Sequence, residues 1–373
     1  MKRKNQLTLS FSLKRMMELY KKQVSVNTKN KRKIYKFEEF YTANITNVFN
    51  MLEDDNYIVG AYNIFLIKDP KYRIIMSQKM NDKIINHVMA DILIKVLEPS
   101  LIDTNVATRK NKGTHFGIKY LKSYMNELKK DGNIYALKFD ISKYFYNIDH
   151  DVLKELLKKK IKDKQYLKIL FKIIDSTNKN VNDRIIKIKN NEIEILKETN
   201  LNDKEKRIRE IMSIPLYEKG KGLPIGNMTS QIMAVYYLNE LDHYIKEKLH
   251  IKCYIRYMDD GVLLSNNKEY LKYCLEKIEG IITQYKLKLN DKTKIINVTK
   301  EGLDFLGFRF YVLNNKIIMK VRKDTKKRFK RKILAINKGK IDEEKALQII
   351  NSYKGHLKWG NCYNLARDVL KNK

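Results

Sequence analysis

The sequence has few of the residues that break regular structure or cross-link a chain. Its 373 residues include 3 cysteines, 4 prolines, 14 glycines and 1 tryptophan. The cysteines, Cys253, Cys274 and Cys362, are far apart and odd in number, which argues against a disulfide framework and indicates a reducing compartment. No Cys-x-x-Cys or His-Glu-x-x-His pattern occurs, so we expect neither a structural zinc site nor a zinc protease.

Long apolar runs are also missing. The basic N-terminal segment 1–22 lacks the continuous apolar core of a signal peptide. The longest stretch without charged residues, 222–239, contains Pro224, Asn227 and Gln231 and would cross a bilayer only at high cost. We therefore expect no transmembrane segment, no membrane partner and a cytoplasmic location.

Acidic residues are too few to balance the basic ones. The chain has 77 Lys and Arg against 43 Asp and Glu, a formal net charge of +34. An anionic partner would relieve the self-repulsion of so large a charge. Nucleic acid is the first candidate and an anionic membrane surface the second, and we expect nucleic acid to be the partner. Hydrophobic residues make up 43% of the chain, which is a globular composition.

Because turn residues are scarce, apolar periodicity is the main guide to secondary structure. Helical spacing covers the segments 11–55, 80–98, 115–130, 151–175, 228–249, 268–286 and 323–373. Strand patterns cover the segments 59–68, 72–76, 134–140, 253–257, 261–265 and 303–313. Strands and helices interleave without the regular spacing of a doubly wound sheet, which predicts an α+β fold. The polar segment 176–220 is expected to be a helical or mobile insertion.

Three aspartates stand at the ends of apolar strands. Asp140 ends the strand pattern 134–140, and Asp259 and Asp260 lie in a turn between two further strands. If that hairpin lies beside the first strand, three carboxylates meet at one sheet edge, where divalent cations would relieve their repulsion. Two such ions about 4 Å apart stabilise the attacking and leaving oxygens of phosphoryl transfer. Taken alone, each motif is more often a solvated hairpin tip or a helix cap.

Two further segments could contact a nucleotide. The loop 220–231 is punctuated by glycine and runs into a helix, so a nucleotide and its template base could approach it closely. As an ordinary loop, it would have Thr229 or Ser230 as the helix cap. Lys68, Lys71 and Arg73 surround a strand turn, where they form either a solvated basic hairpin or a clamp on a triphosphate.

Five motifs together resemble those of reverse transcriptases in order and approximate spacing: 139–145, 220–231, 257–260, 287–295 and 305–308. The chain is similar to bacterial, non-viral reverse transcriptases, and the segments 73–89 and 107–121 resemble the fingers of group II intron-like enzymes. The resemblance covers roughly residues 60–313. It implies a right-hand polymerase with an N-terminal helical extension (1–58), fingers and palm (59–313, with the 176–220 insertion) and a basic helical thumb (314–373).

The resemblance implies an RNA-directed DNA polymerase that adds deoxynucleotide triphosphates to the 3′-OH of a DNA or RNA primer on an RNA template. Two Mg²⁺ ions, or Mn²⁺ as a substitute, would be held by Asp140, Asp259, Asp260 and the backbone carbonyl of Ile141. The residues that match the nucleotide site are Lys71, Arg73, Phe145 as the gate against a ribose 2′-OH, Ile225, Gly226, Gln231 and Lys292. As alternatives, Phe145 is a core aromatic and Ile225 packs under its loop.

The resemblance also implies contacts with nucleic acid. The residues that match the primer grip are Phe305, Leu306, Gly307 and Phe308. The residues that match a thumb helix tracking a duplex backbone are Lys320, Arg322, Lys323, Lys326, Lys327, Arg328, Lys330 and Arg331. A solvated or membrane-surface helix is the alternative for 320–332.

The biological subgroup stays open. Most relatives have Gln where this chain has Ile225, and the loop 225–231 resembles that of diversity-generating retroelement enzymes, which implies error-prone copying at template adenines. Diversity-generating retroelement enzymes usually lack an insertion like 176–220. Defence-associated and abortive-infection reverse transcriptases, which could make DNA without a conventional template, are diverse enough to accommodate it. A maturase-like RNA-binding protein with a vestigial polymerase site is a further alternative. Any accessory protein or structured RNA would come from a neighbouring gene.

Overall fold

The computed structural model describes residues 6–53, 57–363 and 367. The extreme ends of the expected N-terminal extension and thumb therefore lie outside the described residues. The chain forms two compact units, each assembled from several segments. Unit 1 comprises 1–101, 141–240 and 282–288, and unit 2 comprises 102–140, 241–281 and 289–373.

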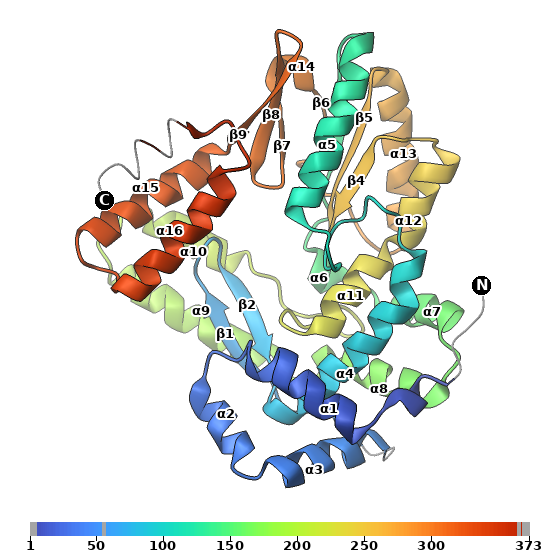
Figure 1. Cartoon of the computed structure of the whole chain (residues 1–373), viewed down its shortest axis with the longest axis vertical. Helices are drawn as coiled ribbons and strands as arrows, with labels where there is room; N and C mark the ends of the chain where they lie inside the picture. Colours follow the sequence, from blue (N-terminus) through green and yellow to red (C-terminus); the bar gives the residue numbers. More distant parts are fainter. Residues whose placement is uncertain (1–5, 54–56, 364–366, 368–373) are drawn as a thin grey trace. The chain divides into compact units, whose positions relative to one another are not determined.

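Unit 1 is mainly helical, with one small sheet (Figure 1). Its two strands, β1 (Asn63–Ile67) and β2 (Arg73–Ser77), form an antiparallel hairpin in which Ile67 pairs with Arg73. Its helices are α1 (Leu13–Leu19), α2 (Lys31–Glu38), α3 (Tyr41–Glu53), α4 (Met80–Leu97), α6 (Tyr144–Asn147), α7 (His150–Lys160), α8 (Lys164–Ile174), α9 (Asn182–Lys197), α10 (Lys204–Met212) and α11 (Met228–Tyr237). Helix α4 buries ten of its residues, the polar Asp82 and Asn86 among them, as expected of a central helix that packs against α1, α3 and α11.

Unit 2 contains two antiparallel sheets. The four-stranded sheet has the order β4 (Tyr254–Tyr257), β5 (Asp260–Ser265), β3 (Tyr135–Phe139) and β6 (Lys294–Asn297). The three-stranded sheet has the order β7 (Leu303–Phe305), β8 (Phe308–Leu313) and β9 (Lys316–Val321). The helices of this unit are α5 (Thr114–Leu128), α13 (Lys268–Gln284), α14 (Val298–Glu301), α15 (Lys323–Asn337) and α16 (Glu343–Leu357), while α12 (Asn239–His243) begins in unit 1 and ends in unit 2.

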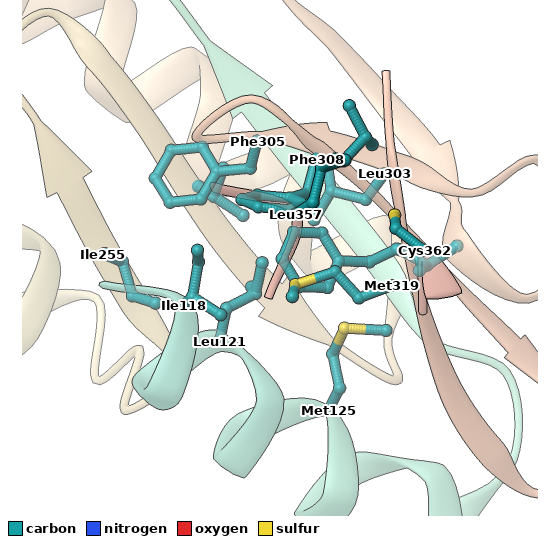
Figure 2. Close-up of a cluster of buried hydrophobic side chains, with 14 of the residues drawn as sticks. Ile118, Leu121, Met125, Ile255, Leu303, Phe305, Phe308, Met319, Leu357 and Cys362 are labelled. Atoms are coloured by element: carbon teal, nitrogen blue, oxygen red, sulfur yellow. The ribbon is translucent and has the colours of Figure 1, made fainter. Parts of the chain in front are cut away.

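One apolar core joins both sheets of unit 2 to its helices. Ile118, Leu121 and Met125 recur at helical spacing on α5 and point into this core, together with Phe305 and Phe308 of the small sheet (Figure 2). Burying each such side chain contributes about 1.5–3 kcal/mol relative to leaving it exposed. The core therefore holds the two sheets together and fixes the edges of the four-stranded sheet.

The α+β class is confirmed, and most of the expected strands and helices are present. The segment 303–313, however, is two strands and not one, because Leu306 (φ 49°) and Gly307 (φ 86°) form a tight turn in the left-handed region. The insertion forms the regular helices α9 and α10. Among the described residues, no helix is long and apolar enough to cross a bilayer.

Of the basic segment 320–332, only the part from Lys323 is helical, as the helical spacing of 323–373 predicts, so the assignment of 320–322 to the thumb helix is wrong. Lys320 and Val321 end strand β9, and α15 begins only at Lys323. The cause is alternation of side chains, since buried Met319 and Val321 pair with the strand β8 and override the local helical preference. Strands β6 and β9 were not predicted.

Candidate active site

Three carboxylates lie at one edge of the four-stranded sheet. Asp140 directly follows the central strand β3, and Asp259 lies in the turn between β4 and β5, with Asp260 as the first residue of β5. Strand β5 pairs with β3 so that Phe139 stands opposite Gly261. A Cβ at Gly261 would lie 2.2 Å from the Phe139 ring, so only glycine allows this close approach. The hairpin beside the Asp140 strand is therefore as the sequence predicts.

Burial and mutual repulsion dominate the electrostatics of these groups. Burial, and then the negative charge of Asp140, raises the pKa of Asp259 to about 7. A hydrogen bond that protonated Asp259 can donate to the Asp140 carboxylate raises this pKa further. Burial raises the pKa of Asp260 to about 6, although the nearby Lys138 ammonium acts in the opposite direction. Two groups with raised pKa values at one sheet edge are typical of a functional site.

Lys138 of β3 is a neighbour that the sequence motifs did not identify. Its Nζ lies 3.2 Å from Oδ2 of Asp260 and donates a hydrogen bond to the carbonyl of Asp304 at 2.9 Å. The second oxygen of Asp260, Oδ1, is buried and has no hydrogen-bond partner. The carboxylate is therefore only partly neutralised.

The donor atoms fit a hard divalent cation. Carboxylate oxygens are the ligands that Mg²⁺ and Mn²⁺ prefer, and the unpartnered oxygen of Asp260 and the carboxyl pair of Asp140 and Asp259 are the groups that would hold it. In the part of the chain described, no group of three or more His, Cys, Asp or Glu side chains already has the arrangement of a metal site. Ile141 belongs to unit 1, whereas the three aspartates belong to unit 2. Its carbonyl therefore remains a predicted ligand only.

The raised pKa values predict a pH-dependent stability in the absence of divalent cations. A carboxyl group with a raised folded-state pKa stabilises the fold fully below its unfolded value of about 4, and this contribution is lost as the pH rises through the folded value of about 7. We expect the melting temperature in EDTA to fall more between pH 4 and pH 8 for the parent protein than for Asp259→Asn. The exposed Asp131→Asn serves as control, and parallel curves for all three proteins would contradict the prediction.

The residues predicted to bind a nucleotide gather mainly in unit 1. Arg73 is exposed on the β1–β2 hairpin, and its charge counteracts the increase that burial causes in the pKa of Tyr146. Lys71 is exposed in the turn of the hairpin. Lys68 is instead paired with Glu192 of α9, with 2.7 Å between Nζ and Oε1. Of the three predicted cations, Lys71 and Arg73 thus remain the better candidates for a phosphate.

The glycine-rich loop packs against strand β2. The carbonyl of Ile225 accepts a hydrogen bond from the amide of Met76 at 2.8 Å. Gly226 has φ 133°, and a Cβ there would lie 2.8 Å from the carbonyl oxygen of Met76. The side chain of Ile225 is half-buried, while Gly226 is exposed. The loop and the hairpin that presents Arg73 are therefore fixed to each other.

The predicted gate residue is connected to the same loop. Phe145 lies in α6, is half-buried and makes an edge contact with the ring of Tyr144. Its carbonyl accepts a hydrogen bond from the amide of Leu223 at 2.7 Å. Gln231 is half-buried in α11, and Lys292 is exposed in unit 2.

Buried polar side chains form hydrogen bonds with the end of the loop and the start of α11. Sequence motifs did not predict these contacts. The Tyr62 hydroxyl accepts a hydrogen bond from Asn227 at 3.0 Å and lies 2.9 Å from the hydroxyl of Ser176. Asn86 of α4 accepts a hydrogen bond from the amide of Thr229 at 3.1 Å. Neither Thr229 nor Ser230 caps α11, which corrects the expected cap, because the N-cap residue is Asn227 and it makes no side-chain capping bond.

The insertion is attached to the same region of unit 1. Helix α9 packs against β1. Arg184 donates a hydrogen bond to the carbonyl of Tyr62 at 2.7 Å, and Lys179 donates one to the carbonyl of Val59. Asn182 exchanges two hydrogen bonds with the backbone of Tyr217. With the Lys68–Glu192 ion pair, these bonds join the α9–α10 segment to the hairpin.

The predicted nucleic-acid contacts divide into buried and exposed groups. Phe305 and Phe308 are core side chains, 1% and 0% exposed, so only the turn at Leu306 and Gly307 between them is accessible. Helix α15 buries Phe329, Ile333 and Ile336 on one face. The predicted bases on its exposed face and just before it are Arg322, Lys323, Lys327, Lys330 and Arg331, while Lys326 and Arg328 are half-buried and Lys320 is exposed on β9.

Residues 67–310 match the family described as "Reverse transcriptase (RNA-dependent DNA polymerase)". The chain is 21% identical to Protein YkfC of Escherichia coli (strain K12) over 265 residues, which cover 62% of this chain and 61% of that protein. It thus spans less than two thirds of the length of this curated relative.

Similar solved structures include a telomerase from Candida tropicalis truncated from its C-terminal domain (TM-score 0.47, 16% identity, 70% of this chain and 55% of that chain). Another is the telomerase from Candida albicans in complex with a fragment of telomeric RNA (TM-score 0.42, 14% identity, 90% and 60%).

Proposed function

Because the chain belongs to the reverse transcriptase family of RNA-dependent DNA polymerases, we propose that it extends a DNA or RNA primer with deoxynucleotides on an RNA template. The observation that supports this most is the meeting of Asp140, Asp259 and Asp260 at one edge of the sheet in unit 2. A maturase-like protein with a vestigial site would not need all three, since buried like charges are costly to keep together.

Each group has a role in this proposal. Two Mg²⁺ ions, when bound by the three aspartates and the Ile141 carbonyl, supply charge stabilisation for the attacking and leaving oxygens. Lys71 and Arg73 bind the triphosphate of the incoming nucleotide, for which the guanidinium offers a bidentate fork, and Lys292 lies near its phosphates. Phe145, Ile225, Gly226 and Gln231 surround its sugar and base. Positioning and charge neutralisation are the main contributions of the protein to phosphoryl transfer.

The direct test is copying of a defined primed RNA. Purified protein, template, labelled primer, the four deoxynucleotides and Mg²⁺ are expected to give products of template length and complementary sequence. Mn²⁺ is expected to substitute, and EDTA to stop the reaction. Absence of any extension with several primer and template combinations would refute the proposal.

Phe145→Ala is expected to weaken the choice between deoxyribonucleotides and ribonucleotides. Only the bulk of the ring at this position excludes a 2′-OH in the proposed site, and relieving a clash of about 1–3 kcal/mol corresponds to about 5–150-fold. Competition between the two nucleotide types in single-nucleotide extension measures the ratio. If the variant discriminates as well as the parent, Phe145 is a packing residue and the gate lies elsewhere.

Ile225 supports an error-prone, diversifying enzyme over an accurate one. Its branched apolar side chain offers no hydrogen bond to a nascent base pair, and recognition by apolar contact discriminates less sharply than hydrogen bonding. We expect frequent misincorporation, biased toward template adenines.

Ile225→Gln should lower the error rate by about fivefold, since one added hydrogen bond contributes about 1 kcal/mol. Sequencing the products of both proteins on one mixed-sequence RNA measures this difference. Accurate copying by the parent would discard the diversifying role. Products unrelated to the template would instead favour a defence enzyme, for which the insertion α9–α10 is the supporting feature.

A further inference from the structure

Arg256 is the largest side chain that the described chain buries almost completely, and it stands two residues before the catalytic turn. It belongs to the apolar strand β4, and its exposed fraction is 0%. A guanidinium cannot lose its charge at ordinary pH, so its burial requires a partner for each donor. The partners show what this side chain does.

Asp242 holds one side of the guanidinium. Nε and Nη2 of Arg256 donate to Oδ1 and Oδ2 of Asp242 at 2.7 and 2.6 Å, a bidentate pair in which both residues are 0% exposed. The same carboxylate accepts hydrogen bonds from the Tyr254 hydroxyl at 2.8 Å and from Asn105 at 3.1 Å. The carboxylate is thus fixed from several directions, and it fixes the plane of the guanidinium in turn.

The third guanidinium nitrogen of Arg256 contacts the turn formed by Met258 and Asp259. Nη1 of Arg256 donates to the backbone carbonyl of Met258 at 2.6 Å. Met258 has φ 57°, a left-handed conformation that costs energy for a side chain with a Cβ. The peptide that contains this carbonyl leads directly into Asp259. Arg256 therefore stabilises the strained residue that determines where the Asp259 carboxylate points.

The backbone around Arg256 is equally fixed. Its amide donates to the carbonyl of Thr104 at 3.1 Å, and its carbonyl accepts from the amide of Val106 at 3.0 Å. Across the hairpin it pairs with Gly261. The guanidinium thus projects from a rigid strand toward a turn whose own conformation is unfavourable.

Packing alone does not explain this arrangement. A buried ion pair is often no more stabilising than well-packed apolar residues of the same volume, and Ile255 and Val262 show that apolar side chains suit this sheet. An apolar side chain at position 256, however, would leave the Met258 carbonyl without its donor. The buried Arg256–Asp242 ion pair therefore indicates that the conformation of the turn at Met258 has to be fixed.

We propose that Arg256, oriented by Asp242, is a positioning residue that holds the Met258–Asp259 turn so that Asp259 can bind a divalent cation. The activity consequence rests on the proposed polymerase function, whereas the effect on cation binding does not. Arg256→Lys retains the positive charge but has no planar fork, so it cannot hold Asp242 bidentately and the turn carbonyl together.

The test measures Mn²⁺ binding to the full-length protein by electron paramagnetic resonance. Binding that persists in Asp259→Asn is subtracted, so that only binding at the Asp259 site is compared. Changes in residues that orient metal ligands typically cost 10–100-fold in affinity, so Arg256→Lys is expected to raise the Kd for Mn²⁺ by about tenfold or more. The Mg²⁺ concentration for half-maximal primer extension should rise in parallel. The matched control is Ile255→Ala, which removes a buried side chain from the same strand without touching the turn, and its Mn²⁺ affinity should stay within about twofold of the parent.

Equal Mn²⁺ affinity of Arg256→Lys and the parent would overturn the inference, as would an equal loss in Ile255→Ala. If Arg256→Lys does not fold, Asp242→Asn, which keeps the size of the side chain and removes the charge that orients the guanidinium, takes its place, and an unchanged Kd then overturns the inference. A parent protein that binds Mn²⁺ more tightly than the variant but copies no RNA would refute only the polymerase proposal.

Discussion

Asp259→Asn should reduce Mg²⁺-dependent primer extension by about a thousandfold or more, while the protein still folds and binds RNA. The substitution removes one negative charge from the carboxylate cluster at the end of β3 and keeps the size of the side chain. Charge stabilisation by bound metal contributes several kcal/mol, and each 1.36 kcal/mol corresponds to tenfold in rate. Single-turnover extension on a primed RNA measures the loss, and filter binding measures RNA affinity.

The exposed Asp131→Asn is the control for the change in charge, and it should extend primers at the rate of the parent protein. Because the pKa of Asp259 is raised by burial, loss of its charge should not lower the melting temperature in EDTA at pH 8. Substantial polymerisation by Asp259→Asn would show that the site lies elsewhere in the chain.

The second large effect concerns the exposed face of α15. Replacing Lys323, Lys327, Lys330 and Arg331 together by Gln should weaken binding to an RNA–DNA duplex and flatten its salt dependence. Each lost phosphate contact lowers the slope of log K against log salt concentration by up to about 0.9. The buried face formed by Phe329, Ile333 and Ile336 is unchanged, so the helix should keep its packing.

A matched variant separates local contacts from net charge. Lys31, Arg32, Lys33 and Lys36 lie exposed on α2 in unit 1, and their replacement by Gln removes the same four charges. Affinity titrations from 50 to 300 mM salt compare the two proteins. Equal slopes for the α15 and α2 variants would mean that α15 contacts no duplex.

The carboxylate site could be predicted from sequence because its signals are local. An apolar strand ending in Asp140 and two apolar strands around Asp259 and Asp260 need only period-two alternation and a turn. Their meeting in one sheet followed from the family motifs. The groups around them could not be predicted in this way, because Lys138 meets Asp260 across more than 100 residues of sequence.

The sequence carries one further signal for this site. Arg256 lies inside the apolar strand pattern 253–257, where a charge requires a buried acid. Asp242, 14 residues earlier, is that acid. The strand β9 was missed for another reason, since its apolar alternation is short and directly precedes a strongly basic helix. The Tyr62–Asn227 hydrogen bond left no sequence signal at all, because neither residue type is unusual in a loop.

The attachment of α9 to the β1–β2 hairpin limits how the inserted segment can be removed from this chain. The carbonyls of Val59 and Tyr62 accept their hydrogen bonds from Lys179 and Arg184, and Lys68 is paired with Glu192. A chimera that replaces the inserted helices by a short loop would leave buried acceptors unbonded and would release Lys68 beside Lys71. The segment is thus an integral part of unit 1, and a chain without it would have to satisfy these groups with different residues.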